Sequence, residues 1–397
     1  MDAKSNTPFP ISLKERVLQT LPEAEIYTVS PGRVNLLGEH VDYNQGMVLP
    51  AAIDRQVYMA CKSRDDRLLI LNSLDFSETI SVDLNQLQQR IDTSGKPLPG
   101  WALYPAGVAW ALNNKGFEIS GAEIAFTSVV PIGAGLSSSA AIEVGFAVSF
   151  QALQGWSIDR MHLARICQEA ESQYVGVHCG LMDQFACAHG VAGHALYFDT
   201  RNLEWMPIPL PHGVSIIIAD SGVQRTLANS AYNERRKECE QAVALFSTHL
   251  PNIHSLRDVE WDDFVRLRSH LPQVVAMRVE HVIAEIARVQ QACQLLMQDD
   301  VRALGDLMLA GHNSLRDLYQ VSCPELDDLV EIAIVLQGCY GARLTGAGFG
   351  GCIVTLVQNE NVDAFTEQLA EQYLQRTGKS AKVYVCQAAR GAYTTQV

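Results

Sequence analysis

A loop of glycines and serines in the first half of the chain could cradle phosphate. It covers 131–139 and joins a run typical of a strand, 122–130, to a run typical of a helix that starts at Ser137. Glycines let backbone N–H groups approach oxygen atoms closely, and the first amides of a helix favour negative charge. Serine hydroxyls can donate to phosphate oxygens or ligate a metal. An ordinary serine-capped helix is the alternative interpretation.

A second segment, 31–44, concentrates charged and polar side chains. Arg, Asn, Glu, His, Asp and Tyr occur within these few positions, and we expect the segment to lie between strands. Such convergent donors and acceptors suit a polyhydroxylated ligand, because each hydroxyl both donates and accepts a hydrogen bond. A polar surface loop is the alternative.

Four further features could complete a site with these segments. Asp183 lies among apolar neighbours, where it could accept a proton from a hydroxyl, cap a helix or form a structural ion pair. Glu171 lies in a helical stretch, where most acidic residues are simply solvated. A glycine-rich turn at 343–351 could let backbone pass close to a ligand, or could serve only as a tight connection. Tyr232 begins an Arg-rich helix, and its ordinary interpretation is a partly exposed tyrosine.

The composition limits the classes of function. The chain has 397 residues, with 30 Lys and Arg against 44 Asp and Glu, which gives a net charge of −14. We expect no nucleic-acid partner, because that affinity depends on Lys and Arg neutralising phosphates. We also expect no signal peptide and no membrane span, since no apolar run is long enough. Ten scattered cysteines without Cys-x-x-Cys spacing indicate reduced thiols in a cytoplasmic protein.

The order of expected elements predicts an α+β protein with two lobes. The segment 209–213, rich in proline and glycine, is the best candidate for a hinge between them. Alternating or apolar runs predict strands at 57–61, 68–71, 79–84, 122–130, 195–199, 204–208, 214–219, 352–357 and 382–386. Helical spacing of apolar residues predicts helices at 231–246, 282–297, 301–312, 324–337 and 363–378.

Taken together, these segments resemble the galactokinase family of the GHMP small-molecule kinases. The segment 32–43 resembles the sugar signature of that family, 131–140 the phosphate loop of the superfamily and 344–352 its third motif. The three occur in the expected order, and the resemblance continues between and beyond them over nearly the whole chain. Val41 and Pro105 depart from the usual pattern and leave the sugar preference and the adenine contact open.

The resemblance implies a ribosomal-S5-like N-terminal lobe over 1–211 and a ferredoxin-like C-terminal lobe over 212–397, with the last strand able to return to the first lobe. It implies that the sugar is bound by Glu39, His40, Val41, Asp42, Gly180, Asp183 and Tyr232. It implies that ATP is bound by Ser73, Trp101, Gly133, Ala134, Gly135, Leu136, Ser137, Ser138 and Ser139. Mg²⁺ would be held by Ser139 and Glu171.

The implied reaction is transfer of the γ-phosphoryl group of ATP to the C1 hydroxyl of galactose. We expect Asp183 to accept the hydroxyl proton, or mainly to orient the hydroxyl, and Arg33 to keep Asp183 ionised and to stabilise developing charge. An N-acetylgalactosamine kinase, another sugar-1-kinase, or a sensor of galactose and ATP without catalysis are the alternatives. Sugar and ATP are the expected partners of a monomer or weak dimer.

Overall fold

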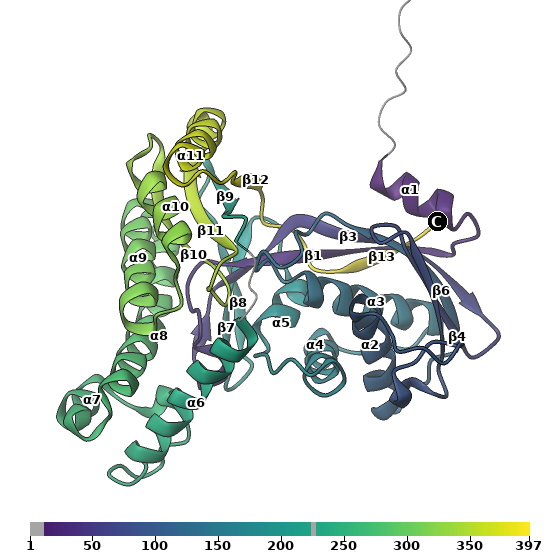
Figure 1. Cartoon of the computed structure of the whole chain (residues 1–397), viewed down its shortest axis with the longest axis horizontal. Helices are drawn as coiled ribbons and strands as arrows, with labels where there is room; N and C mark the ends of the chain where they lie inside the picture. The colour runs from purple at the N-terminus through teal and green to yellow at the C-terminus, as the bar shows by residue number, and fades with distance from the viewer. Residues whose placement is uncertain (1–11, 224–227) are drawn as a thin grey trace, which may run out of the picture.

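The computed structural model describes residues 12–223 and 228–397, which form two lobes that lie side by side (Figure 1). The expectation of no signal peptide concerns the first residues of the chain and lies outside this description. The larger sheet, in the N-terminal lobe, has the order β13-β1-β3-β6-β4-β5. Its strands are β1 Ile26–Asn35, β3 Pro50–Arg64, β4 Leu68–Ser73, β5 Glu78–Asp83, β6 Gly121–Ser128 and β13 Tyr393–Gln396.

Helices cover one face of this sheet, as Figure 1 shows below strands β1 and β3. Helix α3 packs against β1 and β3, and α5 packs against β1. Most of their buried positions are small or apolar residues, with Glu143, Ser149 and Gln184 as buried polar exceptions. The helices of this lobe are α1 Leu13–Thr20, α2 Leu103–Asn114, α3 Ser138–Gln154, α4 Arg160–Glu169 and α5 Met182–His189.

The second lobe contains a sheet of order β10-β11-β9-β12 with helices α8, α9, α10 and α11 around it (Figure 1). A small sheet of order β2-β7-β8 lies between this lobe and the first. The strands are β2 Met47–Val48, β7 His194–Asp199, β8 Trp205–Pro209, β9 Val214–Asp220, β10 Cys339–Leu344, β11 Cys352–Gln358 and β12 Lys382–Cys386. The helices are α6 Ala228–Phe246, α7 Trp261–Leu267, α8 Gln273–Met297, α9 Val301–Ser314, α10 Pro324–Val335 and α11 Val362–Thr377.

The two lobes are joined closely at the end of β1. The Thr345 hydroxyl donates to the Asn35 carbonyl oxygen and accepts from the Asn35 N–H, each at 3.0 Å. At the other end of the same strand, β13 pairs antiparallel with β1, with Ile26 opposite Gln396. The chain therefore crosses to the second lobe and comes back to the sheet on which it started.

Two differences from the expected elements bear on function. The polar segment 31–44 does not lie wholly between strands, because Pro31–Asn35 is the buried end of β1. Helix α8 begins at 273 and not near 282, because its first turns carry Arg278 and His281 on the inward side, where the helical pattern of apolar residues is interrupted. Most other expected spans lie within three residues of the observed ones, and the α+β class is confirmed.

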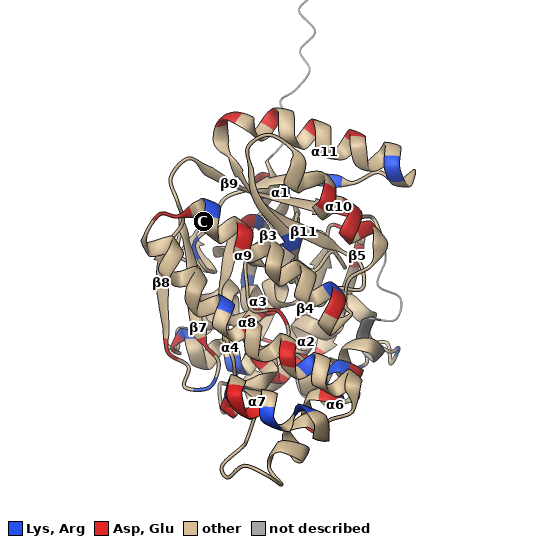
Figure 2. Ribbon diagram, turned by 90° about the vertical axis from the view of Figure 1, so that its left-hand side faces the viewer, with Lys and Arg blue, Asp and Glu red and all other residues tan. Residues whose placement is uncertain are grey.

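Acidic residues are frequent along α10 and α11 in Figure 2, in agreement with the net charge of −14. None of the helices within 12–223 and 228–397 has the length and apolar character that a membrane crossing requires.

Candidate active site

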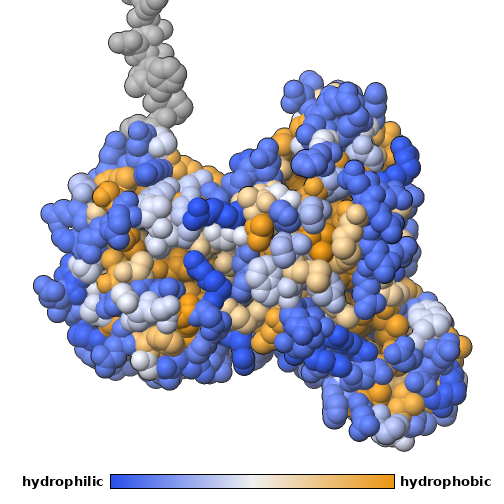
Figure 3. Space-filling model, turned by 180° about the vertical axis from the view of Figure 1, so that it is seen from behind, coloured by the Kyte–Doolittle hydropathy of each residue, from blue (hydrophilic) through white to orange (hydrophobic). Residues whose placement is uncertain are grey.

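Two neighbouring cavities lie where the lobes meet. Figure 3 shows that the back of the molecule is also hollowed between the lobes. The first cavity, of about 340 Å³, has walls from both lobes, and the second, of about 500 Å³, lies over the glycine- and serine-rich loop. Arg33, Gly133, Asp183 and Ala347 line both cavities. A group at this border can therefore touch molecules in both.

An ion pair between Arg33 and Asp183 occupies that border. Arg33 lies on β1 and is 4% exposed, and Asp183 lies in the first turn of α5. Arg33 Nε donates to Asp183 Oδ1 at 2.8 Å, and Nη2 lies 2.6 Å from the same oxygen. The Ser137 hydroxyl donates to Asp183 Oδ2 at 2.5 Å. Both oxygens of the carboxylate are thus held in place by two different segments.

The loop 131–139 is fastened to the same arginine. Arg33 Nη1 donates to the Gly135 carbonyl oxygen at 2.6 Å, and the Arg33 N–H donates to the Leu136 carbonyl oxygen at 3.1 Å. A Cβ at Gly32 would approach that Leu136 oxygen to 2.7 Å, so glycine allows this contact. Ser137 has φ 56° and caps no helix, because its hydroxyl is engaged by Asp183. The alternative of a serine-capped helix is therefore wrong.

Of the residues expected to bind the nucleotide, the second cavity is lined by Trp101, Gly133, Gly135, Ser137, Ser138 and Ser139. Ala134 and Leu136 also belong to the loop, but their side chains are buried. Ser73 is also buried, and neither it nor these two residues line this cavity.

Trp101 belongs to an aromatic end of the second cavity whose other residues were not expected from the sequence. The Phe76 ring stacks on Trp101, with ring centroids 5.9 Å apart and an angle of 9° between the planes. Tyr104, Phe126 and Ile132 extend the same apolar wall. A phenylalanine in the polar turn between β4 and β5 was the available signal, because such turns rarely carry an aromatic residue without a packing partner.

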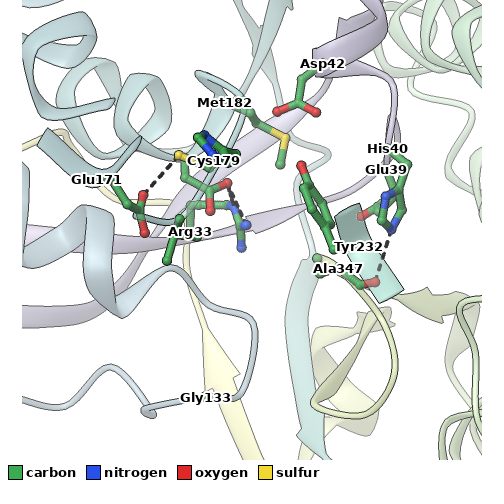
Figure 4. A pocket seen from close by; sticks show the side chains of 15 residues that line it. Arg33, Glu39, His40, Asp42, Gly133, Glu171, Cys179, Met182, Tyr232 and Ala347 are labelled. Carbon is green, nitrogen blue, oxygen red and sulfur yellow. Dashed lines mark hydrogen bonds and ion pairs between the residues drawn. The ribbon is translucent and has the colours of Figure 1, made fainter. Parts of the chain in front are cut away.

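Most of the segment 36–44 is buried at the first cavity, so the alternative of a polar surface loop is wrong. Glu39 and His40 are 1% and 5% exposed and line the cavity together with Asp42. His40 Nε2 lies 3.1 Å from the Ala347 carbonyl oxygen and Nδ1 lies 2.9 Å from the Tyr43 hydroxyl. In Figure 4, Asp42 and the Tyr232 side chain point toward one another across the cavity.

Gly180 and Val41 complete the account of the residues expected to bind the sugar. Gly180 lines the first cavity, and a Cβ there would overlap the Asp42 carboxylate, so this position requires glycine. The side chain of Val41 is fully buried in the core and is not among the residues that line the cavity. The structure thus brings Arg33, Glu39, His40, Asp42, Gly180, Asp183 and Tyr232 together around one space.

Glu171 lies on the other wall, in a π-helical turn at Ala170–Val175. Its Oε2 accepts from Gln184 Nε2 at 2.7 Å and from Cys179 Sγ at 3.2 Å. Burial raises the pKa of Glu171, and a hydrogen bond from the Ser139 hydroxyl acts in the opposite direction. A carboxylate and a hydroxyl in contact are hard oxygen donors, which fits a Mg²⁺ ion that shares its other positions with phosphate and water.

The comparisons with known proteins agree on one family. Family profiles described as "Galactokinase galactose-binding signature", "GHMP kinases N terminal domain" and "GHMP kinases C terminal" match residues 18–63, 104–191 and 292–375. A galactokinase from Roseiflexus sp. (strain RS-1) is 45% identical over 362 residues, which cover 91% of each chain. One from Chloroflexus aggregans is 44% identical with the same coverage.

The chain belongs to the galactokinase family. A crystal structure of Lactococcus lactis galactokinase complexed with galactose superimposes on this chain with a TM-score of 0.90, at 33% identity, and covers 96% of this chain and 98% of its own. The Methanococcus jannaschii mevalonate kinase shares the fold alone, with a TM-score of 0.64 at 19% identity over 92% of this chain and 99% of its own. The predicted family, GHMP kinase fold and kinase class are therefore confirmed.

The surroundings of Asp42 predict a pH-dependent loss of stability in this galactokinase-family chain. Burial raises the pKa of Asp42 from 3.8 to about 6, and the negative charge of Asp183 adds to the rise. The native state thus holds this proton more tightly than the unfolded chain does, so stability falls as the pH rises from about 4 to about 6. The stability of Asp42→Asn relative to the wild type should therefore rise by about 3 kcal/mol between pH 4 and pH values above this range.

Urea unfolding at a series of pH values between 4 and 8 measures this difference. Asp363→Asn, at an exposed position in α11, is the matched control. A difference between Asp42→Asn and wild type that stays constant across this range would contradict the prediction.

Proposed function

We propose that this chain transfers the γ-phosphoryl group of ATP to the C1 hydroxyl of galactose, and forms galactose 1-phosphate and ADP. The observation that carries the proposal is the position of the Arg33–Asp183 pair, which borders both the cavity of the galactokinase signature and the cavity of the phosphate loop. An acceptor hydroxyl and a donor phosphate would meet at that border.

Asp183 would accept the proton of the attacking hydroxyl. Its Oδ1 is paired with Arg33 and its Oδ2 accepts from Ser137, so the carboxylate is oriented before the substrate arrives. Phosphoryl transfer passes through a loose transition state in which positioning and charge stabilisation supply most of the catalysis. Arg33 would hold the carboxylate in place and stabilise the charge that develops on the attacking oxygen and the transferred group.

The first cavity would bind the sugar through convergent acceptors and donors. Glu39, His40, Asp42 and Tyr232 present polar groups to a space of about 340 Å³, which suits a monosaccharide. The backbone at Gly180 would add a contact, since the missing side chain leaves Asp42 in place. Two buried carboxylates in this wall would disfavour an acidic sugar by like-charge repulsion.

The second cavity would bind ATP. Trp101 and Phe76 form a flat apolar surface that suits adenine, and the backbone N–H groups and hydroxyls of 133–139 suit phosphates. Ser139 and Glu171 would hold Mg²⁺, which neutralises phosphate charge when it is bound. The oligomeric state, a monomer or weak dimer, and the location in the cytoplasm stay predictions.

The proposed substrate is tested by an ADP-release assay with a panel of sugars at saturating ATP and Mg²⁺. Galactose should give the highest kcat/KM among galactose, N-acetylgalactosamine, glucose and galacturonate, and galacturonate the lowest. A highest value with N-acetylgalactosamine would replace the proposed substrate. Binding of galactose and ATP without ADP release for any sugar would favour a sensor.

The proposed role of Asp183 predicts the effect of Asp183→Asn. An amide cannot accept the hydroxyl proton, so kcat should fall about 100-fold or more while the far-UV circular dichroism spectrum stays unchanged. Single-turnover phosphorylation of galactose measures this effect, with the exposed substitution Asp363→Asn as control. A rate near that of the wild type would refute the role of base.

The proposed metal site predicts the effect of Glu171→Gln. The loss of a carboxylate ligand should raise the Mg²⁺ concentration that gives half-maximal rate by about tenfold. Glu169→Gln is the matched control, because Glu169 pairs with Lys115 just before the same turn. The Mg²⁺ dependence of ADP release measures both variants, and equal curves would show that Glu171 has only a structural role.

A further inference from the structure

A buried arginine lies behind the sugar-binding wall without lining the cavity. Arg343, on β10, is fully buried, and its Nη2 lies 2.5 Å from Glu39 Oε2 and 2.7 Å from Glu285 Oε1. Glu285 lies on α8 and is also paired with Arg288, whose Nε donates to Glu285 Oε2 at 2.6 Å. One guanidinium of the C-terminal lobe thus connects two carboxylates, one of which belongs to the sugar cavity.

The C-terminal lobe also binds the backbone at Gly38 and Glu39. The Gly38 N–H donates to Glu285 Oε1 at 2.8 Å. His281 Nε2, one turn earlier on α8, lies 3.3 Å from the Glu39 carbonyl oxygen. Glu39 is therefore positioned through its backbone and its side chain by residues of α8 and β10.

The electrostatic balance at Glu39 depends on Arg343. Burial raises the pKa of Glu39, the nearby Glu285 raises it further, and Arg343 opposes both effects. Neither Glu39 oxygen accepts a well-aligned hydrogen bond from residues 12–223 or 228–397. A buried acceptor with this geometry can serve a ligand hydroxyl, provided that a nearby cation keeps it ionised and oriented.

We propose that Arg343, held by Glu285, is a positioning residue for the sugar: it orients the Glu39 carboxylate, and thereby sets affinity for the sugar and not for ATP. This inference rests on the proposed function, because it takes galactose as the ligand of the first cavity. Arg343 lines neither cavity and acts through Glu39.

Arg343→Lys tests the proposal, because lysine keeps the charge but its side chain ends one bond short of Nη2, the atom that contacts both carboxylates. We expect the dissociation constant for galactose, measured by calorimetry without nucleotide, to rise about tenfold or more. The constant for a non-hydrolysable ATP analogue with Mg²⁺ should change by less than about twofold. Equal weakening of both ligands, or unchanged galactose binding, would overturn the proposal.

Arg278→Lys is the matched control. Arg278, on α8 of the same lobe, is also almost fully buried. It donates to Glu238, to the Leu318 carbonyl oxygen and to the Gln320 amide oxygen. Its replacement should lower thermal stability without changing the ratio of the two dissociation constants. A ratio that shifts as much as in Arg343→Lys would show a general effect of losing a buried arginine.

A double-mutant cycle with Glu39→Gln isolates the coupling. If Arg343 acts through Glu39, then Arg343→Lys should weaken galactose binding by less than about threefold in the Glu39→Gln background. Independent effects that multiply in the double variant would overturn the proposal. Wild-type protein that fails to bind galactose at all would overturn both the proposed function and this inference, whereas binding that Arg343→Lys leaves unchanged would overturn the inference alone.

A second variant keeps every charge in case Arg343→Lys fails to fold. Gly311, on α9, faces the guanidinium, and a Cβ there would lie 2.5 Å from Arg343 Nη1 and 3.0 Å from Cζ. Gly311→Ala favours the helix but displaces the guanidinium, so galactose should bind more weakly while the ATP analogue binds as before. Galactose affinity equal to that of wild type in a folded Gly311→Ala protein would overturn the proposal.

Discussion

The pairing of one arginine with one aspartate governs the arrangement of this active site. Arg33 comes from a buried strand and Asp183 from the start of a helix, and the arginine also donates to the carbonyl of Gly135 in the phosphate loop. A buried guanidinium must satisfy its donors, so the strand, the helix and the loop are fixed relative to one another by the same group. The serine hydroxyl on the second carboxylate oxygen leaves the aspartate little freedom to rotate.

The sugar cavity depends on the C-terminal lobe, although several of the residues that line it belong to the N-terminal lobe. Glu39 follows β1 of the N-terminal lobe, yet the groups that hold it belong to α8 and β10. The two hydrogen bonds between Thr345 and the Asn35 backbone join the same two lobes a few residues before Glu39. Separation of the lobes would therefore expose buried charges, which makes a closely packed junction the stable arrangement.

Much of this fold could be predicted from the sequence, because strands such as β7 and β11 and helices such as α9 and α10 carry clear apolar periodicity. Most of the residues that the resemblance to the galactokinase family singled out line the two cavities, although each motif taken alone also had an ordinary structural interpretation. The buried ion pairs could not be predicted in the same way. Arg343 and Glu285 are 58 positions apart, and nothing in a periodic pattern distinguishes a charge that is buried with a partner from one in solvent.

The pairing of β13 with β1 has a consequence for how the protein is made. More than 350 residues separate the two strands in the sequence, so β1 leaves the ribosome long before β13. Until β13 emerges, the outer edge of the strand that bears Arg33 has unsatisfied amides and carbonyls, which invites pairing with other nascent chains. Synthesis must therefore pass residue 396 before this edge is protected, so the nascent chain has a long interval in which a chaperone would be useful.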